Sequence, residues 1–242
     1  MPEQEIIKHA NKAYKVFKSP NMSMKSKITD ILTEIGIIVF AVSISIWLSN
    51  WSEKRHDRKE EKEFLSGFKK DLKSEIENMT SSRDFYISTL HGIEYFLSIQ
   101  KGLSLNRDSI NKYSFIFFSS TDLDPHVSRY EGLKSSGKFK IIENKELLNN
   151  IIDLQETVIQ RIQTLNEKYY QHNQLLENLI NQNVQLAKNG NITNAAAVVS
   201  RSDMVILLNT SAGIIETNII GIHDEGIKKC KEIIGQIDEE LK

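Results

Sequence analysis

A long uncharged run near the N-terminus dominates the pattern of apolar and polar positions. From Ile35 to Ser52 no residue is charged, and apolar side chains would occupy every face of a helix formed by this segment. Glu34 and Glu53 bracket the run. Adding Ile31 to Thr33 brings the length to the about 20 residues that a spanning helix needs. The pattern predicts a transmembrane helix over residues 31–52, and the alternative is the core helix of a soluble protein.

The residues at the end of this run favour the membrane interpretation. Trp47 and Trp51 stand where an aromatic belt at the lipid–water interface belongs, and a basic cluster begins directly afterwards with Lys54 and Arg55. The segment is not typical of a cleaved signal peptide, because the basic region before it exceeds 30 residues and no small-residue cleavage site follows. We therefore interpret the two tryptophans and the two bases as interfacial anchors of a signal anchor.

Orientation in the membrane is nearly balanced. Lys12, Lys15, Lys18, Lys25 and Lys27 precede the run, and Lys54, Arg55, Arg58, Lys59 and Lys62 follow it, so the positive-inside rule does not decide. The leader has no acid between Lys8 and Lys27, whereas acids offset the bases on the far side. We favour a cytoplasmic N-terminus and a periplasmic C-terminal domain, in a single-pass protein of the bacterial inner (cytoplasmic) membrane.

Beyond the run, apolar residues recur every three or four positions, which is typical of long amphipathic helices. Three such stripes are predicted: on a helix of residues 53–100, on a helix that begins after Asn144 and ends at 188–190, and on a helix that begins near Ser202 and has a kink or break at 221–226. The first has Arg83 in its one gap. The second includes Ile162, Leu165, Tyr169, Leu176 and Leu179, and His172 interrupts it. His172 is interpreted as a hydrogen-bonded core residue rather than a ligand.

These elements predict an all-α fold: one N-terminal transmembrane helix continuing into a long helix, followed by an antiparallel helical bundle. The predicted organisation is a basic amphipathic leader over 1–30, the transmembrane helix over 31–52 and a helical soluble domain over 53–242. In the leader, Ile6, Ala10, Ala13 and Phe17 have helical spacing with lysines between them, as in a helix lying on anionic lipid; a frayed, solvated terminus is the alternative.

A stripe of small residues lies on one face of the predicted span. Ala41, Ser45 and Ser49 recur every four residues, which lets two membrane helices approach closely, and Glu34 falls on the same face. An acid at this depth favours a protein partner or water over lipid. We predict that these four residues pack against a helix of a second copy or of another membrane protein. The alternative places Glu34 at the interface, where it merely favours the helix N-terminus.

Composition and motifs give little sign of chemistry. The net charge is −1, so no nucleic-acid partner is expected, and the single cysteine, Cys230, rules out an intrachain disulfide. Asp122, Asp124 and His126 form a possible metal-binding loop, or equally a helix-capping loop. No phosphate loop, zinc-protease motif or nucleophile elbow is found. We therefore predict no enzyme, no cofactor and no catalytic, cofactor-binding or metal-binding residue.

Two stretches together resemble a known family. One runs from Glu34-Ile35-Gly36 through Trp47-Leu48-Ser49-Asn50-Trp51-Ser52-Glu53, and the other runs from Tyr130 to Leu147. They are similar to an uncharacterised family of bacterial single-span membrane proteins, domain of unknown function 6090, over about half of the chain. The resemblance implies a cell-envelope protein and supplies no activity.

The predicted function is therefore that of a membrane-anchored helical interaction or scaffold protein, whose partners are the lipid bilayer and a second copy or a membrane protein. Long heptad-like stripes of the coiled-coil type and the small-residue face of the span both point that way. The alternative is a membrane effector or sensor that forms a pore or signals on assembly, as in bacterial defence or stress responses.

Overall fold

The computed structural model describes residues 7–8, 11–12, 14–15, 24–102, 104, 106–188 and 192–242. Within these ranges every regular element is helical, apart from one isolated β-bridge between Leu186 and Ile192. The predicted all-α fold is confirmed. Packing divides the chain into two units, Met1–Glu61 and Lys62–Lys242. Helix α2 (Met24–Gln100) contributes to both units.

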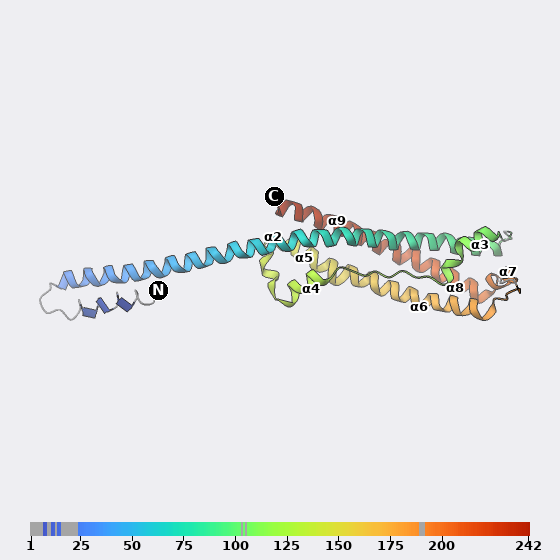
Figure 1. Cartoon of the computed structure of the whole chain (residues 1–242), viewed down its shortest axis with the longest axis horizontal. Coiled ribbons are helices and arrows are strands. Elements are labelled where there is room, and N and C mark those ends of the chain that lie inside the picture. The colour runs from blue at the N-terminus through green and yellow to red at the C-terminus, as the bar shows by residue number, and fades with distance from the viewer. Residues whose placement is uncertain are drawn as a thin grey trace. The chain divides into compact units, whose positions relative to one another are not determined.

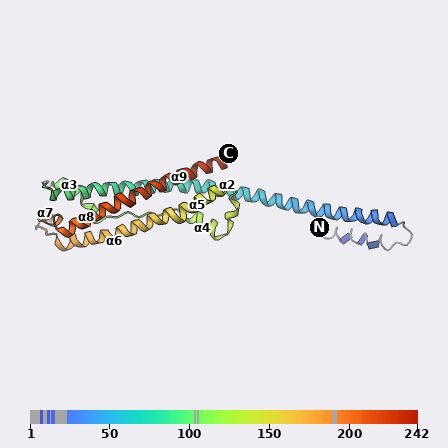
Figure 2. The same cartoon turned by 180° about the vertical axis from the view of Figure 1, so that it is seen from behind.

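The second unit contains three long helical elements and the segments that connect them (Figures 1 and 2). The first is α2 from Lys62 onward. The second and third are helices that each contain one π-turn in their course. Their bounds are α5 (Lys145–Asp153), the π-turn η3 (Leu154–Val158) and α6 (Ile159–Asn183), then α8 (Ser202–Ile214), the π-turn η4 (Ile215–Ile219) and α9 (Ile220–Glu240).

Shorter elements fill the two connections. Between α2 and α5 lie α3 (Arg107–Tyr113), the 3₁₀ turn η1 (Ser114–Phe117), an irregular stretch over 119–127, α4 (Ser128–Ser135) and the 3₁₀ turn η2 (Lys138–Ile141). Between α6 and α8 lies α7 (Ala195–Val199).

Local sequence explains several of these boundaries. Gly102, with φ 95°, follows the end of α2, and Gly137, with φ 66°, follows α4, so both occupy the left-handed conformation that ends helices. Asn144 caps α5, because its side chain accepts hydrogen bonds from the backbone N–H groups of Glu146 and Leu147. These ends of α2 and α4 and this beginning of α5 lie at residue types that favour helix termini.

Contacts between the long helices define their directions. Lys69 and Arg83 of α2 pair with Asp238 and Asp224 of α9, so these two helices are antiparallel. Asn144 and Asn150 donate to Glu240 and Gln236, so α5–α6 is also antiparallel to α8–α9. Consequently α2 and α5–α6 run parallel, while the two long helical elements that follow α2 are antiparallel to each other, as predicted. The irregular stretch 119–127 makes the parallel arrangement possible, because it carries the chain back along the bundle (Figure 1).

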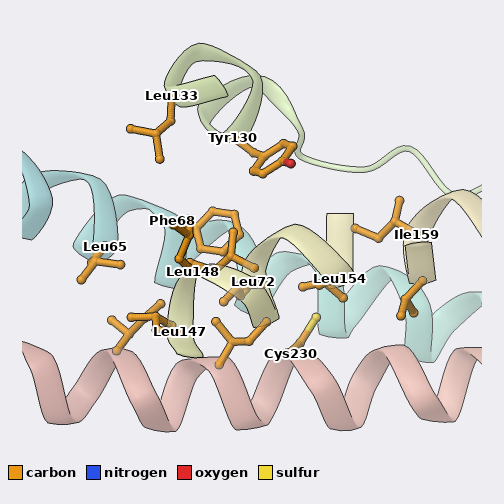
Figure 3. Close-up of a cluster of buried hydrophobic side chains, with 14 of the residues drawn as sticks. Leu65, Phe68, Leu72, Tyr130, Leu133, Leu147, Leu148, Leu154, Ile159 and Cys230 are labelled. Carbon is orange, nitrogen blue, oxygen red and sulfur yellow. The ribbon is translucent and has the colours of Figure 1, made fainter. Parts of the chain in front are cut away.

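The bundle interior consists of two apolar clusters that follow one another along the helices. The first contains Phe68, Leu72, Leu147, Leu154 and Cys230, which converge from α2, α5–η3 and α9 (Figure 3). The second is built around aromatic residues, including Tyr86, Phe96, Phe117 and Tyr169. Burying these side chains supplies the main driving force for assembly of the bundle, at about 25 cal/mol per Å² of apolar surface.

Two predicted helix features differ from the structure. Helix α6 ends at Asn183 rather than at 188–190, because the side chain of Asn194 donates to the carbonyl of Asn183 and accepts from the backbone N–H of Gln185. Helix α9 has no break at 221–226. Gly226 instead permits close packing: a Cβ there would lie 2.7 Å from Sδ of Met79.

Candidate functional site

The uncharged run forms a helix whose apolar side chains are unprotected by the rest of the chain. Only 6% of the most apolar stretch of this helix is buried, and the helix is long and apolar enough to cross a membrane. Every residue from Ile35 to Ser52 is exposed except the half-buried Ile38. Exposed apolar surface of this extent marks an interaction site, either for lipid or for another protein.

The four residues predicted to pack against another membrane helix divide into two groups. Ala41, Ser45 and Ser49 are exposed, and the Ser45 hydroxyl donates to the Ala41 carbonyl at 2.9 Å. Glu34 is buried, and its Oε1 lies 2.6 Å from Nζ of Lys12. The hydrogen bond and charge of Glu34 raise the pKa of the Lys12 ammonium. Glu34 therefore has a basic partner within its own chain.

The predicted leader helix lies largely outside the described residues. Ile6, Ala10, Ala13 and Phe17 are among those not described, so the amphipathic stripe stays a prediction. Before residue 24, the described leader residues are Ile7, Lys8, Asn11, Lys12, Tyr14 and Lys15, which have helical conformation and exposed side chains. Residues 24–30 of the leader belong to helix α2.

The predicted interfacial anchors lie at the end of the run and directly after it. Trp47, Trp51, Lys54 and Arg55 are all exposed. The Arg55 guanidinium lies 5.5 Å from the centroid of the Trp51 ring, within range of a cation–π interaction. This arrangement sets aromatic rings beside positive charge, as interfacial segments require.

A polar layer lies where the two apolar clusters of the bundle meet, and the sequence pattern does not predict it. We define it as Ser82 and Tyr86 of α2, Asn166 of α6 and His223 of α9, all buried. The Tyr86 hydroxyl donates to Oδ1 of Asn166 at 3.0 Å. Burial of Tyr86 raises the pKa of its hydroxyl, so that group stays a donor at neutral pH.

The hydrogen bonds of His223 identify its tautomer. Nδ1 lies 2.8 Å from the Ile219 carbonyl, which only accepts, so Nδ1 carries the proton. Burial lowers the pKa of the imidazole, which keeps the ring neutral. Nε2 therefore accepts a hydrogen bond from the Ser82 hydroxyl, 3.1 Å away. The His223–Ser82 pair resembles a base and nucleophile, but both side chains are buried, so neither reaches a substrate in this conformation.

The predicted metal loop is arranged around a buried acid. Asp122 and Asp124 are exposed, whereas the backbone N–H of His126 donates to Oε1 of Glu75 and its Nδ1 lies 3.1 Å from the same oxygen. Oε2 of Glu75 is buried without a hydrogen-bond partner. Within the described ranges, no three His, Cys, Asp or Glu side chains are close enough to share an ion. The contacts therefore give His126 a role in holding the irregular stretch 119–127 to α2.

Cys230 and His172 have structural surroundings. Cys230 is fully buried in the first cluster, and burial raises the pKa of its thiol to about 12, so it is neither ionised nor accessible. Nε2 of the half-buried His172 lies 3.1 Å from the Leu207 carbonyl of α8. The predicted hydrogen-bonded role of His172 is confirmed.

A second helical stretch, Ser202–Glu240, also passes the length and composition test for a span, and 28% of its most apolar part is buried. Its buried face includes Met204, Leu208 and Ile215 in the second apolar cluster, and its charged residues pair with α2 and α5. These contacts are those of a bundle helix.

Comparisons with protein-family models, with curated protein sequences and with solved structures find no match to this chain.

Proposed function

We propose that this protein is anchored in a membrane by residues 31–52 of α2 and presents its helical bundle on one side as an interaction domain. The observation that carries the proposal is the exposed apolar surface of that segment, with 6% of its most apolar stretch buried. The free energy of transferring so many apolar side chains from water to lipid favours insertion. The Trp51–Arg55 contact at the end of the segment supports an interfacial position for that turn.

Membrane extraction tests the anchor directly. The full chain and a chain that begins at Glu53 are expressed in a bacterium, and membranes are washed with alkaline carbonate. We expect the full chain to stay in the pellet and the shortened chain to be soluble. Release of the full chain by carbonate would show that the segment does not span the bilayer.

We propose further that the bundle lies in the periplasm of a bacterial cell and the leader in the cytoplasm. Because Cys230 is the single cysteine and is buried, Cys230→Ser supplies a background without reactive thiols. Single cysteines at exposed Lys101 and exposed Lys15 are then treated with a membrane-impermeant maleimide in intact cells. Labelling at Lys101→Cys but not at Lys15→Cys supports this orientation, and the opposite pattern reverses it.

The partner that we propose for the span is a second copy, through Ala41, Ser45 and Ser49. These three side chains are exposed on one face, and small side chains allow close helix approach. The double substitution Ala41→Leu/Ser45→Leu should reduce self-association in membranes, measured by energy transfer between labelled chains. Ser43→Leu is the matched control, because residue 43 is about 200° around the helix from both positions. Equal association in the two variants would remove this interface.

A further inference from the structure

An apolar cavity opens at the end of the bundle where α2 ends and where α3 and α7 lie (Figures 1 and 2). Its volume is about 340 Å³. It is about 50 Å along α2 from Lys62, the first residue of the second unit, given 1.5 Å per residue. The walls come from α2, α3, η1, α6, α7 and the β-bridged segment around Leu186 and Ile192.

The cavity has a rigid apolar floor. Phe96 and Phe117 are buried, and their ring centroids are 4.9 Å apart. Val198 and Val199 of α7 are also buried and line it. Because these side chains belong to the second apolar cluster, the floor is already packed without an occupant.

The rim of the cavity is apolar and open to solvent. Phe118, Leu186 and Ile192 line it and are 53%, 64% and 46% exposed. Three large apolar side chains from separate segments therefore surround one opening in water, an arrangement typical of a binding site.

The lining determines which class of ligand fits. Among the lining residues that the structure describes, only Ser114 and Asn181 are polar, and none is charged. An ionic ligand would lose its hydration there without a compensating partner. The volume lies near the lower end of the range for small-molecule sites, about 300–1,000 Å³.

We propose that this cavity binds a small, uncharged and largely apolar molecule, with Ser114 or Asn181 available to one polar group on it. The aromatic floor favours a ligand with a ring. This site is independent of the proposed membrane anchor, because every residue that lines it belongs to the second unit.

Photolabelling of the full-length protein in detergent tests the site, with 3-trifluoromethyl-3-phenyldiazirine as an uncharged aromatic probe. Labelled residues are mapped by peptide mass spectrometry. Labelling of the cavity lining should saturate with probe concentration and fall with excess trifluoromethylbenzene. Trifluoromethylbenzoate, which is charged, should not compete. The apolar run 35–52 is an internal reference. The probe that partitions into the micelle should label this run in proportion to its concentration, without saturation.

Two neighbouring alanines of α7 give matched variants. Ala195 lines the cavity, whereas Ala197 is exposed and does not line it. Ala195→Trp should reduce labelling of the lining by roughly tenfold or more, and Ala197→Trp should leave it unchanged. If Ala195→Trp loses cooperative unfolding, Ser114→Leu, which fills the cavity from η1, decides instead.

Three outcomes would overturn the proposal. They are labelling of the lining that rises linearly with the probe, labelling that the uncharged competitor does not reduce, and labelling that the cavity-filling variant leaves intact. Loss of labelling on raising the protein concentration alone would also overturn it, because a second copy would then be the occupant.

Discussion

Gly226 of α9 lies where side chains of α2 and α6 approach its backbone closely. A Cβ at this position would lie 2.7 Å from Sδ of Met79 on α2 and 3.3 Å from Cδ1 of Ile162 on α6. Met79 is fully buried among the side chains of the first apolar cluster, so its thioether can move only if its neighbours shift. Glycine is therefore required here for packing, although it weakens the helix in isolation.

We expect Gly226→Ala to lower the free energy of unfolding by about 1–3 kcal/mol through overpacking. Gly235→Ala on the same helix should raise it by up to about 1 kcal/mol, because that position is exposed and no atom lies within 4 Å of an added Cβ. Urea unfolding followed by circular dichroism measures both. If the two variants change the free energy of unfolding in the same direction, the close approach at Gly226 is contradicted.

His223 makes bundle stability depend on pH. Burial lowers the pKa of its imidazole from the ordinary 6.5, Arg83 adds to this shift, and the Ile219 carbonyl and Asp224 oppose it. As the pH falls below 6.5, the unfolded chain binds the proton more readily than the folded chain does, so stability falls over that window.

His223→Gln should reduce the loss of stability between about pH 8 and about pH 5, because glutamine does not take up a proton there. Exposed His91 on α2 supplies the control His91→Gln. Urea midpoints are compared across the range. If the variant and the wild-type chain lose stability in parallel, another group is responsible.

At the scale of the elements, the π-turn η3 explains why the buried face of α6 does not continue the spacing of α5. In α5 the buried positions Leu147, Ile151, Leu154 and Val158 follow the apolar pattern that the sequence predicts. Extending that spacing of four and three gives residues 161, 165, 168, 172, 175 and 179. The extra residue of η3 moves the buried face by one position, to Ile162, Asn166, Tyr169, Asn173, Leu176 and Ile180.

Sequence reasoning therefore predicted the helices and the apolar run but placed some core residues wrongly. On α6 the predicted stripe includes Leu165 and Leu179, which are partly buried against the clusters, and Ile162, Tyr169 and Leu176, which are buried as predicted. The buried Asn166 and Asn173 are not predicted, because both are polar. On α2, Ser82 rather than Arg83 fills the gap in the stripe, for the same reason. Buried polar residues that form hydrogen bonds with one another between helices have the same residue types as surface positions. A single sequence therefore does not distinguish the two.

The Tyr86–Asn166 hydrogen bond should affect the unfolding free energy mainly when one partner is removed, because the other partner is then buried without a hydrogen bond. Tyr86→Phe leaves the Asn166 amide buried without that partner, and we expect a loss of about 1–3 kcal/mol in unfolding free energy. Tyr86→Phe/Asn166→Leu should lose less than the single variant, because no buried polar group is then left unpaired. Tyr170→Phe, at an exposed position on α6, should change stability by less than about 0.5 kcal/mol. If the double variant has a lower unfolding free energy than Tyr86→Phe alone, the lost packing at Asn166 costs more than the unpaired amide does.

At the scale of the whole molecule, the apolar core and the apolar run belong to different parts of the chain. All the buried apolar residues within the described ranges lie from Phe64 onward. We therefore expect residues 53–242 to fold without the N-terminal segment, with a helical circular dichroism spectrum and a single urea transition. Loss of cooperative unfolding in this shortened chain would show that the run contributes to the bundle.

The site components were visible in the sequence to very different degrees. The run Ile35–Ser52 was evident because its signal is contiguous. The cavity was not, because its walls come from residues as far apart as Phe96 and Val199. Nor was the polar layer, in which Ser82 and His223 are 141 residues apart.

The parallel course of α2 and α5–α6 has a consequence for the order of events during synthesis. Helix α2 leaves the ribosome first, yet its partners in the bundle are 80 residues away at Asn166 and 141 residues away at Asp224. The later helices, α5–α6 and α8–α9, are sequential and antiparallel, so their pairing closes a shorter loop. We expect this hairpin to form first and the stripe of α2 to dock last. Until α8–α9 has been synthesised, α2 therefore has an uncovered apolar face. A nascent chain is most open to aggregation and to chaperone binding during this interval.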